Sequence, residues 1–415
     1  PAARAVVDLL LPHVRTEAAR LALLSASWGP DAALGYDIRL AGSAREFAEH
    51  FVAQTLRFGR RADRSGAIDA VLDYLADLGG LEQQQAIADA RAWLHDDPRR
   101  LGISAPYKGL APYAEADAAF FYGRSTLTAE LHARVMRWRA RPDLRRLIAV
   151  IGTSGSGKSS LVRAGLLPTL RDQGWRILTL RPGGDPLRAL ANLLLPAEPE
   201  PAAALDAQQA LVERLQQDDQ LLARALGRPA DADLTQPPAT LLLVDQFEEL
   251  FTLAMDRAGA GDRQPFDVAR TAFVDNLLHA AAAPGGSVGV CLTVRADFYD
   301  RCLAHAGLRS VLSDHQLLVG SLTAAEIREV IERPAERSGY RIEQGLVDVM
   351  LNDLGAVTGQ PEPGFLPLLS QSLLATWQAR QGFTLQVADY QVAGGVRGAI
   401  RTMTDAAYAA LTPAE

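Results

Sequence analysis

Apolar residues in the first quarter of the chain recur at the spacing of a helix. Ser43 and Glu46 form a capping-box pair ahead of an apolar stripe that ends at Gly59. Two further periodic runs cover residues 68–75 and 81–94, with glycines between them. We therefore expect residues 1–95 to form a helical bundle, and we find no set of side chains in it that predicts catalysis.

A basic cluster closes the first of these helices, and its members are Arg57, Arg60, Arg61 and Arg64. Such a cluster is typical of a solvated helix end, and a docking patch is the alternative.

The pattern changes after a proline-marked linker over residues 96–120. Short apolar runs then predict strands at Leu147–Ile151, Trp175–Leu180, Thr240–Val244, Val288–Val294 and Gln316–Val319. Between them, helices are expected over residues 158–170, 185–195, 208–226 and 266–282. This alternation predicts an α/β core over residues 121–321, with a parallel sheet and helices on both faces. From residue 322 the pattern is helical again.

Composition narrows the class of protein. The 415 residues are 48% apolar and 22% charged, which is typical of a soluble globular protein of two or three domains. A net charge of −7 argues against a general nucleic-acid coat. Cys291 and Cys302 match no zinc spacing and cannot build a disulfide framework, which favours a reducing compartment. No apolar run approaches the roughly 18 to 20 residues that span a bilayer, so we expect a cytoplasmic protein.

One glycine-rich segment matches the phosphate-loop pattern at every fixed position: Gly152, Thr153, Ser154, Gly155, Ser156, Gly157, Lys158 and Ser159. Glycines let backbone N–H groups close around phosphates, and the helix that follows presents its positive end to them. Lys158 supplies a cation for the β and γ phosphates, the Ser159 hydroxyl joins the Mg²⁺ ligands, and Ser160 completes the predicted binding set.

A second motif follows the apolar strand at residues 240–244. The strand delivers Asp245 to the carboxyl edge of the predicted sheet, where a carboxylate can hold magnesium directly or through water. Glu248 and Glu249 come soon after, and one of them can activate the attacking water. Which one does so is open from the sequence, and acidic residues also suit a helix N-terminus for structural reasons.

Arg295 ends the next predicted strand and reaches the same edge, where it can contact a γ-phosphate. The structural alternative is a pair with Asp297 or Asp300 in the following turn.

Two more segments are candidates for the nucleotide base. Tyr122, Gly123 and Arg124 precede the core and are in reach of the base and ribose if the linker folds over the site. The alternative is that the aromatic residues there only pack the linker onto the core. Pro367 stands at a first helical turn, where proline needs no functional explanation.

Taken together, residues 106–411 closely resemble the core of the STAND signalling NTPases, in the bacterial subgroup that is related to the NACHT ATPases and often fused to WD-repeat propellers. Five ordered segments carry the resemblance: Pro106–Leu110 with Phe121–Arg124, the phosphate loop with Leu161–Pro168, Val244–Phe251, Leu292–Tyr299 and Gly364–Leu368. One departure is Gln246, where NACHT proteins carry a small residue, and it leaves the geometry of the two glutamates open.

The resemblance implies a multidomain fold with an all-α N-terminal bundle, a central α/β P-loop NTPase, a helical lid over residues 322–385 and the start of a winged helix over residues 386–415. It implies ATP or ADP with Mg²⁺, and no Asn-Lys-x-Asp pattern for guanine is present. It assigns γ-phosphate sensing to Arg295, adenine and ribose contacts to Tyr122, Gly123 and Arg124, and a base contact to Pro367.

Residues 1–95 resemble the effector-associated domains of such proteins, which act as death-domain-like adaptors for a separately encoded effector. The resemblance thus implies a switch that self-associates on exchange of ADP for ATP and resets by slow hydrolysis, in bacterial defence or programmed cell death. A sensor domain is expected beyond Glu415, and neither a membrane nor a nucleic acid is an expected direct partner. An AAA+-like mechanical ATPase that remodels a protein or nucleic acid, and a scaffold that binds nucleotide without hydrolysis, are the alternatives.

Overall fold

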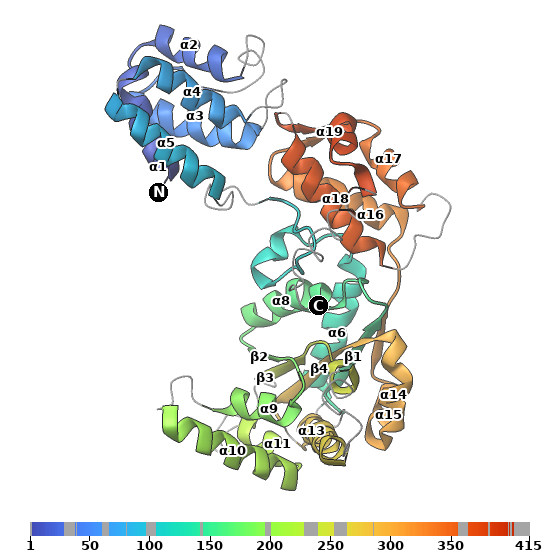
Figure 1. The fold of residues 1–415 in the computed structure, drawn as a ribbon. Helices are drawn as coiled ribbons and strands as arrows, with labels where there is room; N and C mark the ends of the chain where they lie inside the picture. The colour runs from blue at the N-terminus through green and yellow to red at the C-terminus, as the bar shows by residue number, and fades with distance from the viewer. Residues whose placement is uncertain are drawn as a thin grey trace. The chain divides into compact units, whose positions relative to one another are not determined.

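The computed structural model in Figure 1 describes residues 2–28, 38, 40–59, 66–79, 81–96, 105–141, 144–195, 201–227, 240–252, 264–284, 286–355, 364–380, 382–396, 398 and 401. The chain divides into two units. The first combines Pro1–Leu110, Ile327–Gln360 and Pro367–Glu415, and the second combines Ala111–Glu326 with Pro361–Leu366. Within the described residues, no helix is both long enough and apolar enough to cross a lipid bilayer.

The second unit is built on a parallel sheet. Its described strands are β1 (Leu147–Gly152), β2 (Arg176–Leu180), β3 (Thr240–Val244), β4 (Val288–Arg295) and β5 (Gln316–Val319), in the order β2-β3-β4-β1-β5. All four neighbouring pairs are parallel, so the carboxyl ends of the strands meet at one edge. The prediction of a parallel α/β core is confirmed.

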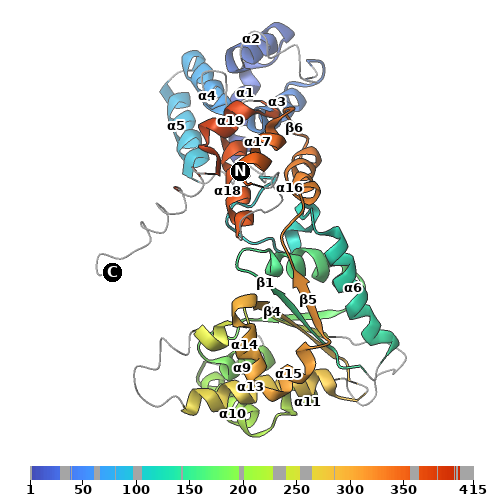
Figure 2. The ribbon, with the colours of Figure 1, turned by 90° about the vertical axis from the view of Figure 1, so that its right-hand side faces the viewer.

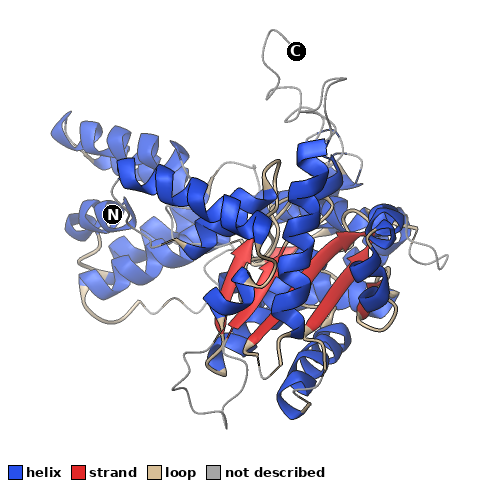
Figure 3. Cartoon of the chain, turned by 90° about the horizontal axis from the view of Figure 1, so that it is seen from below, coloured by secondary structure: helices blue, strands red, loops and turns tan. Residues whose placement is uncertain are grey.

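Helices cover both faces of this sheet (Figures 2 and 3). Along β1, Ile148 and Val150 pack with α6 (Ser125–Ala140) and the helical segment that follows the phosphate loop. Ile151 points the other way, toward a layer that consists of α9 (Pro186–Leu194), α10 (Pro201–Gln217), α11 (Leu221–Leu226), α13 (Gln264–Ala282), α14 (Tyr299–Ala304) and α15 (Ala306–Leu312). Because both faces are covered, the strands are apolar almost throughout, as a doubly covered parallel sheet requires.

Two predicted helices differ in the structure. The helix after the phosphate loop is divided into α7 (Lys158–Ser160), a wider π-helical stretch η5 (Leu161–Leu166) and α8 (Leu167–Asp172). Pro168 has no N–H to donate to the preceding turn, which accounts for the widening there. The helix predicted over residues 208–226 was wrong as one piece. It breaks between α10 and α11 in a turn at residues 218–220, where the Asp218 side chain accepts the Gln220 N–H.

The N-terminal part of the first unit is the predicted bundle. Its helices are α1 (Ala2–Leu10), α2 (Glu17–Trp28), α3 (Ala44–Phe58), α4 (Ala67–Leu78) and α5 (Leu81–Asp96), with a short turn η1 (Leu11–His13) after the first. The capping box is confirmed, because the Glu46 N–H donates to Ser43 Oγ and the Ser43 N–H donates to Glu46 Oε2. Apolar faces of all five helices share one core, which the stacked rings of Phe47 and Phe51 occupy.

The C-terminal part of the first unit is mainly helical, with α16 (Ala324–Arg337), α17 (Leu346–Asp353), α18 (Phe365–Ala379) and α19 (Val387–Val392). A short parallel pair, β6 (Arg341–Ile342) and β7 (Thr384–Leu385), was not predicted, because two-residue strands leave too little pattern to detect. The last part of the expected winged helix, residues 402–415, lies outside the described residues.

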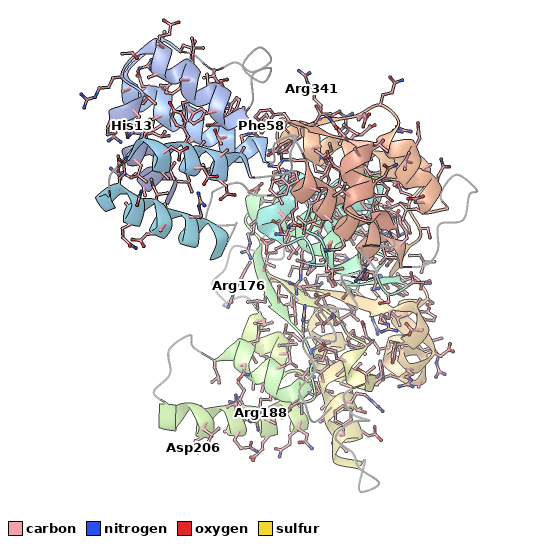
Figure 4. All side chains as sticks on the ribbon, turned by 45° about the horizontal axis from the view of Figure 1, so that its top comes forward. His13, Phe58, Arg176, Arg188, Asp206 and Arg341 are labelled. Atoms are coloured by element: carbon pink, nitrogen blue, oxygen red, sulfur yellow. The ribbon has the colours of Figure 1, made fainter. Side chains whose placement is uncertain are left out.

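An arginine-aromatic cluster joins the end of α3 to this C-terminal part. Arg57 Nη2 donates to the Ser338 carbonyl at 2.6 Å, and Arg380 Nη2 donates to the Arg57 carbonyl at 2.9 Å. Phe58, which is labelled in Figure 4, meets Phe383 edge to face at 6.0 Å. The prediction of a solvated helix end was therefore wrong for Arg57. The rest of its basic cluster, residues 60, 61 and 64, lies outside the described residues.

Arg380 is almost fully enclosed in the cluster, with 3% of its surface exposed. Its guanidinium lies 4.0 Å from the centre of the Trp377 ring and 4.9 Å from that of Tyr340. Burial lowers the pKa of Arg380 from its ordinary value, because desolvation disfavours the charged form. The two ring faces and the carbonyl acceptors offset that cost.

We expect Arg380→Met to destabilise the first unit by about 2 kcal/mol, because the Arg57 carbonyl loses the shorter of its two hydrogen bonds and the two cation–π contacts are lost as well. Urea denaturation followed by tryptophan fluorescence measures this loss. Arg341→Met removes an exposed arginine of the same unit (Figure 4) and should leave the transition unchanged. Equal midpoints for the two variants would contradict the importance of the cluster.

Candidate functional site

The motifs predicted from the sequence meet at the carboxyl edge of the sheet. β1 leads into the phosphate loop, β3 ends just before Asp245, and β4 lies between these two strands. The register pairs Gly152 with Arg295 and Val244 with Leu292, so β4 runs past the end of β3. The edge therefore gathers groups from three neighbouring strands, which is where parallel sheets place their ligands.

The phosphate loop has the backbone that only glycine adopts easily. Gly155 and Gly157 have φ values of 72° and 89°, in the left-handed region. Gly152 is constrained differently, because a Cβ there would stand 2.7 Å from both Ser156 Oγ and the Val319 carbonyl oxygen. These glycines turn the loop back on itself ahead of α7, the arrangement in which successive N–H groups form an anion-binding concavity.

Lys158 begins α7 and is 8% exposed. Its ammonium donates to the carbonyl oxygens of Gly152 at 2.9 Å and Thr153 at 2.8 Å, and so lies over the loop. Burial lowers the pKa of Lys158, while the nearby Glu248 carboxylate opposes that shift. An ammonium has three donors, and these bonds occupy two of them.

Asp245 is fully buried and is held by three side chains. Its Oδ1 accepts the hydroxyl of Ser159 at 2.7 Å and that of Thr293 at 2.6 Å. Its Oδ2 lies 2.8 Å from Arg163 Nη2, in an ion pair without the alignment of a hydrogen bond. A second guanidinium, that of Arg181, lies 4.0 Å away. The predicted metal residues, Ser159 and Asp245, are thus in direct contact.

These residues fit a magnesium nucleotide. Mg²⁺ prefers hard oxygen ligands, and a serine hydroxyl beside a buried carboxylate offers two of them. The Ser156 hydroxyl is buried in the loop with no protein partner among the described residues, which leaves it able to bond a phosphate oxygen.

Gln246 carries the one positive φ, 57°, among the described residues other than glycine. The conformation costs a non-glycine residue on the order of 1 kcal/mol or more. Its N–H donates to Thr293 Oγ1 at 2.9 Å, and the N–H of Phe247 donates to the Thr293 carbonyl at 2.9 Å. The turn directs the two glutamates that follow.

Those glutamates diverge. Glu248 Oε2 accepts the backbone N–H of Arg295 at 3.3 Å, while Glu249 Oε2 accepts that of Gly183, in the loop after β2, at 3.0 Å. Burial raises the pKa of Glu248, and the positive charges of Lys158 and Arg295 act in the opposite direction. Glu248 therefore lies within the electrostatic reach of the phosphate-loop lysine, whereas Glu249 ties the strand end to a neighbouring loop.

Arg295 forms an ion pair with Asp297, which the sequence analysis gave as the structural alternative to a phosphate contact. Its Nε and Nη2 donate to the Asp297 carboxylate at 3.0 and 2.6 Å, and its guanidinium lies 5.3 Å from the Phe298 ring centre. The pair raises the pKa of Arg295 and lowers that of Asp297. Contact between Arg295 and a γ-phosphate stays a prediction.

The linker segment lies along the phosphate loop. Arg124, which is 6% exposed, donates to the carbonyls of Ser156 at 3.3 Å and Gly320 at 2.7 Å, and Ser160 Oγ accepts the Tyr113 N–H at 3.2 Å. Arg124 and Ser160 thus brace the loop.

The other predicted base contacts stay predictions. Tyr122 is half-buried, and Gly123 takes a φ of 79°. From the segment with Pro367, the structure brings Gly364 and Leu366 to the loop, where they lie near Ser154 and Gly157. Pro367 itself belongs to the first unit.

Sequence reasoning missed Thr293 and Arg163. Each left a signal: Thr293 is the single hydroxyl in the apolar strand VGVCLTVR, and Arg163 stands four residues after Ser159, on the same side of a helix.

Two family models match this chain. Residues 106–415 match the family model described as novel STAND NTPase 1, and residues 2–91 match the model of effector-associated domain 8. No curated protein sequence matches the chain.

Three solved structures are similar, at low identity. Cdc6p from Pyrobaculum aerophilum is 14% identical, over 66% of this chain and 63% of its own, with a TM-score of 0.38. The Walker-type ATPase PABY2304 of Pyrococcus abyssi is 12% identical, over 72% of this chain and 75% of its own, with a TM-score of 0.40. The ORC2 protein of Aeropyrum pernix, in ADPNP–ADP complexes, is 16% identical, over 67% and 68%, with a TM-score of 0.41. Scores this low carry no argument about function.

We expect Lys158→Ala to lower ATP affinity by about 100-fold or more, because it removes the cation that faces the phosphates. Titration of a fluorescent ATP analogue measures the change. The chain has one other lysine, and Lys108→Ala is therefore a matched control that should bind as the parent does. Parental affinity in Lys158→Ala would contradict the phosphate-loop assignment.

Proposed function

The chain belongs to the novel STAND NTPase 1 family, and from this premise we propose that it is a switch that binds ATP with Mg²⁺, hydrolyses it slowly and self-associates in the ATP-bound form. The observation that carries the proposal is the 2.7 Å hydrogen bond from Ser159 to Asp245, which brings the two candidate metal ligands together from the phosphate loop and the strand end. Ser159 and Asp245 would hold Mg²⁺, which supplies positive charge against the phosphates.

Glu248 is the residue that we assign to activation of the attacking water. Its carboxylate is partly buried and lies in the field of Lys158 and Arg295, so it faces the charged side of the site. A carboxylate whose pKa is raised by burial is a stronger base than an exposed one, which suits proton abstraction. Glu249 has its carboxylate on the Gly183 N–H, and we assign it to holding that loop.

Arg295 would sense the γ-phosphate by leaving Asp297 and binding the phosphate instead. Its guanidinium is held at two points by Asp297, and a phosphate can likewise accept two hydrogen bonds from a guanidinium through two of its oxygens. In the proposal, a γ-phosphate competes with Asp297 for Arg295, and the turn that carries Asp297 responds.

The N-terminal bundle would deliver the signal. Residues 2–91 match an effector-associated domain, and we propose that they recruit a separately encoded effector, in bacterial defence or programmed cell death, in the cytoplasm. The arginine-aromatic cluster at Arg57 and Arg380 holds the bundle to the helical part, which supports a resting form that must be released. Clustered bundles would then gain avidity for the effector.

We expect Glu248→Gln to lower the rate of ATP hydrolysis by about 100-fold while nucleotide binding persists, because the base is lost and the shape is kept. The variant should also accumulate as an ATP-bound assembly in size-exclusion chromatography. Glu249→Gln is the matched control and should hydrolyse within a few-fold of the parent.

The other outcomes discriminate between functions. Parental behaviour of both glutamine variants would favour a scaffold that does not hydrolyse. Steady turnover without any change in assembly would favour a mechanical ATPase.

The loss of hydrolysis at acidic pH should follow the protonation of the same carboxylate, that of Glu248. Because burial raises the pKa of Glu248, its ionised form is lost as pH falls through a value above that of an exposed glutamate. We expect hydrolysis at saturating ATP to decline over that range, and the decline to disappear in Glu248→Gln. If the hydrolysis rate of the variant declines at acidic pH as that of the parent does, another group is responsible for the decline.

A further inference from the structure

Thr293 binds the end of β3 and the turn after it at three points. Its hydroxyl donates to Asp245 Oδ1 at 2.6 Å and accepts the Gln246 N–H at 2.9 Å. Its carbonyl accepts the Phe247 N–H at 2.9 Å. Thr293 of β4 therefore fixes three consecutive residues, Asp245, Gln246 and Phe247, which lead toward the two glutamates.

Packing alone does not explain a threonine at this position. Thr293 is 1% exposed, and its neighbours along β4, Leu292 and Val294, are also buried. A valine would fill nearly the same volume and suits a strand equally well, but it has no hydroxyl. A buried hydroxyl is costly unless it is bonded, and this one uses both its proton and an oxygen lone pair.

The two bonds of the hydroxyl act on different parts of the site. The bond to Oδ1 selects one orientation of the carboxylate. Among the described residues, its other side-chain neighbours within 4.0 Å are Ser159 Oγ and the guanidinium groups of Arg163 and Arg181. The bond from the Gln246 N–H holds the left-handed turn, which a glutamine does not favour by itself. One side chain thus couples the direction of the metal ligand to the path of the chain toward Glu248.

We propose that Thr293 is a positioning residue for the magnesium site: it holds Asp245 in the orientation that receives Mg²⁺ and holds the turn at Gln246 that sets the course of the following residues. The inference rests on the proposed function, because it presumes that Asp245 binds magnesium. In this proposal Thr293 acts through Asp245 and Gln246, to which its hydroxyl is bonded, and we assign it no direct contact with nucleotide or metal.

The test separates the hydroxyl from the volume of the side chain. Thr293→Val removes the two side-chain bonds and keeps the shape, and Thr293→Ser keeps the hydroxyl and loses a methyl group. A fluorescent ATP analogue is titrated against each variant in EDTA and over a range of Mg²⁺ concentrations. Thermal unfolding without nucleotide reports whether each variant is folded.

We expect Thr293→Val to bind the analogue in EDTA within about twofold of the parent, because the phosphate loop is untouched. Mg²⁺ should increase the affinity for the analogue, and the Mg²⁺ concentration that gives half of this increase should rise about tenfold or more in Thr293→Val. This is the usual effect of removing a group that orients a metal ligand. Thr293→Ser should stay within about threefold of the parent, because it retains the hydroxyl.

An unchanged Mg²⁺ dependence in folded Thr293→Val overturns the inference. So does failure of both variants to fold, since the residue would then serve the sheet rather than the metal site. Lys158→Ala distinguishes these results from failure of the proposed function. If that variant binds the analogue normally, the nucleotide site is elsewhere; if it does not bind while Thr293→Val keeps full Mg²⁺ dependence, only the role of Thr293 is wrong.

Discussion

A fully buried carboxylate is the constraint on which the second unit depends. Asp245 is removed from water, and a buried charge without partners would cost several kcal/mol. Its partners come from three elements: Ser159 from α7, Thr293 from β4 and Arg163 from η5. The need to satisfy one charge therefore brings the helical segment after the phosphate loop together with β4 and the end of β3.

The same constraint separates the roles of two adjacent glutamates. Since β4 fixes the residues after Asp245, the chain passes through the left-handed turn at Gln246 and sends Glu248 toward Arg295 and Glu249 toward Gly183. Two carboxylates that are alike in the sequence thus receive different environments. One is within the field of the phosphate-loop lysine, and the other anchors a loop.

The sequence predicted those parts of the molecule that follow from local pattern. Apolar runs located all five strands of the central sheet, and the capping pair at Ser43 and Glu46 marked the start of α3. It could not predict contacts made across the fold. Arg57 looked like a solvated helix end because its partners, such as Ser338 and Arg380, lie some three hundred positions away along the chain. The break at Asp218 was missed because this turn lies within a sequence pattern that stays helical on both sides of it.

At the site, the phosphate-loop and strand-end residues were predictable because their spacing is fixed by chemistry. The partners of Asp245 were not, since the strand order that sets β4 beside β3 is a property of the whole sheet. The different hydrogen-bond partners of Glu248 and Glu249 depend on the turn at Gln246, where local preference is overridden by hydrogen bonds to Thr293.

The place of β4 between β1 and β3 has a consequence for how the protein tolerates sequence change. Side chains alternate along a strand, so a slip of one residue in β4 would turn Thr293 to the opposite face and carry Arg295 away from Gly152 at the same time. The support of Asp245, the candidate metal ligand, and the position of Arg295, the candidate phosphate sensor, would be lost together. Insertions or deletions in this strand should therefore be all-or-none in effect, whereas substitutions at either position can be graded.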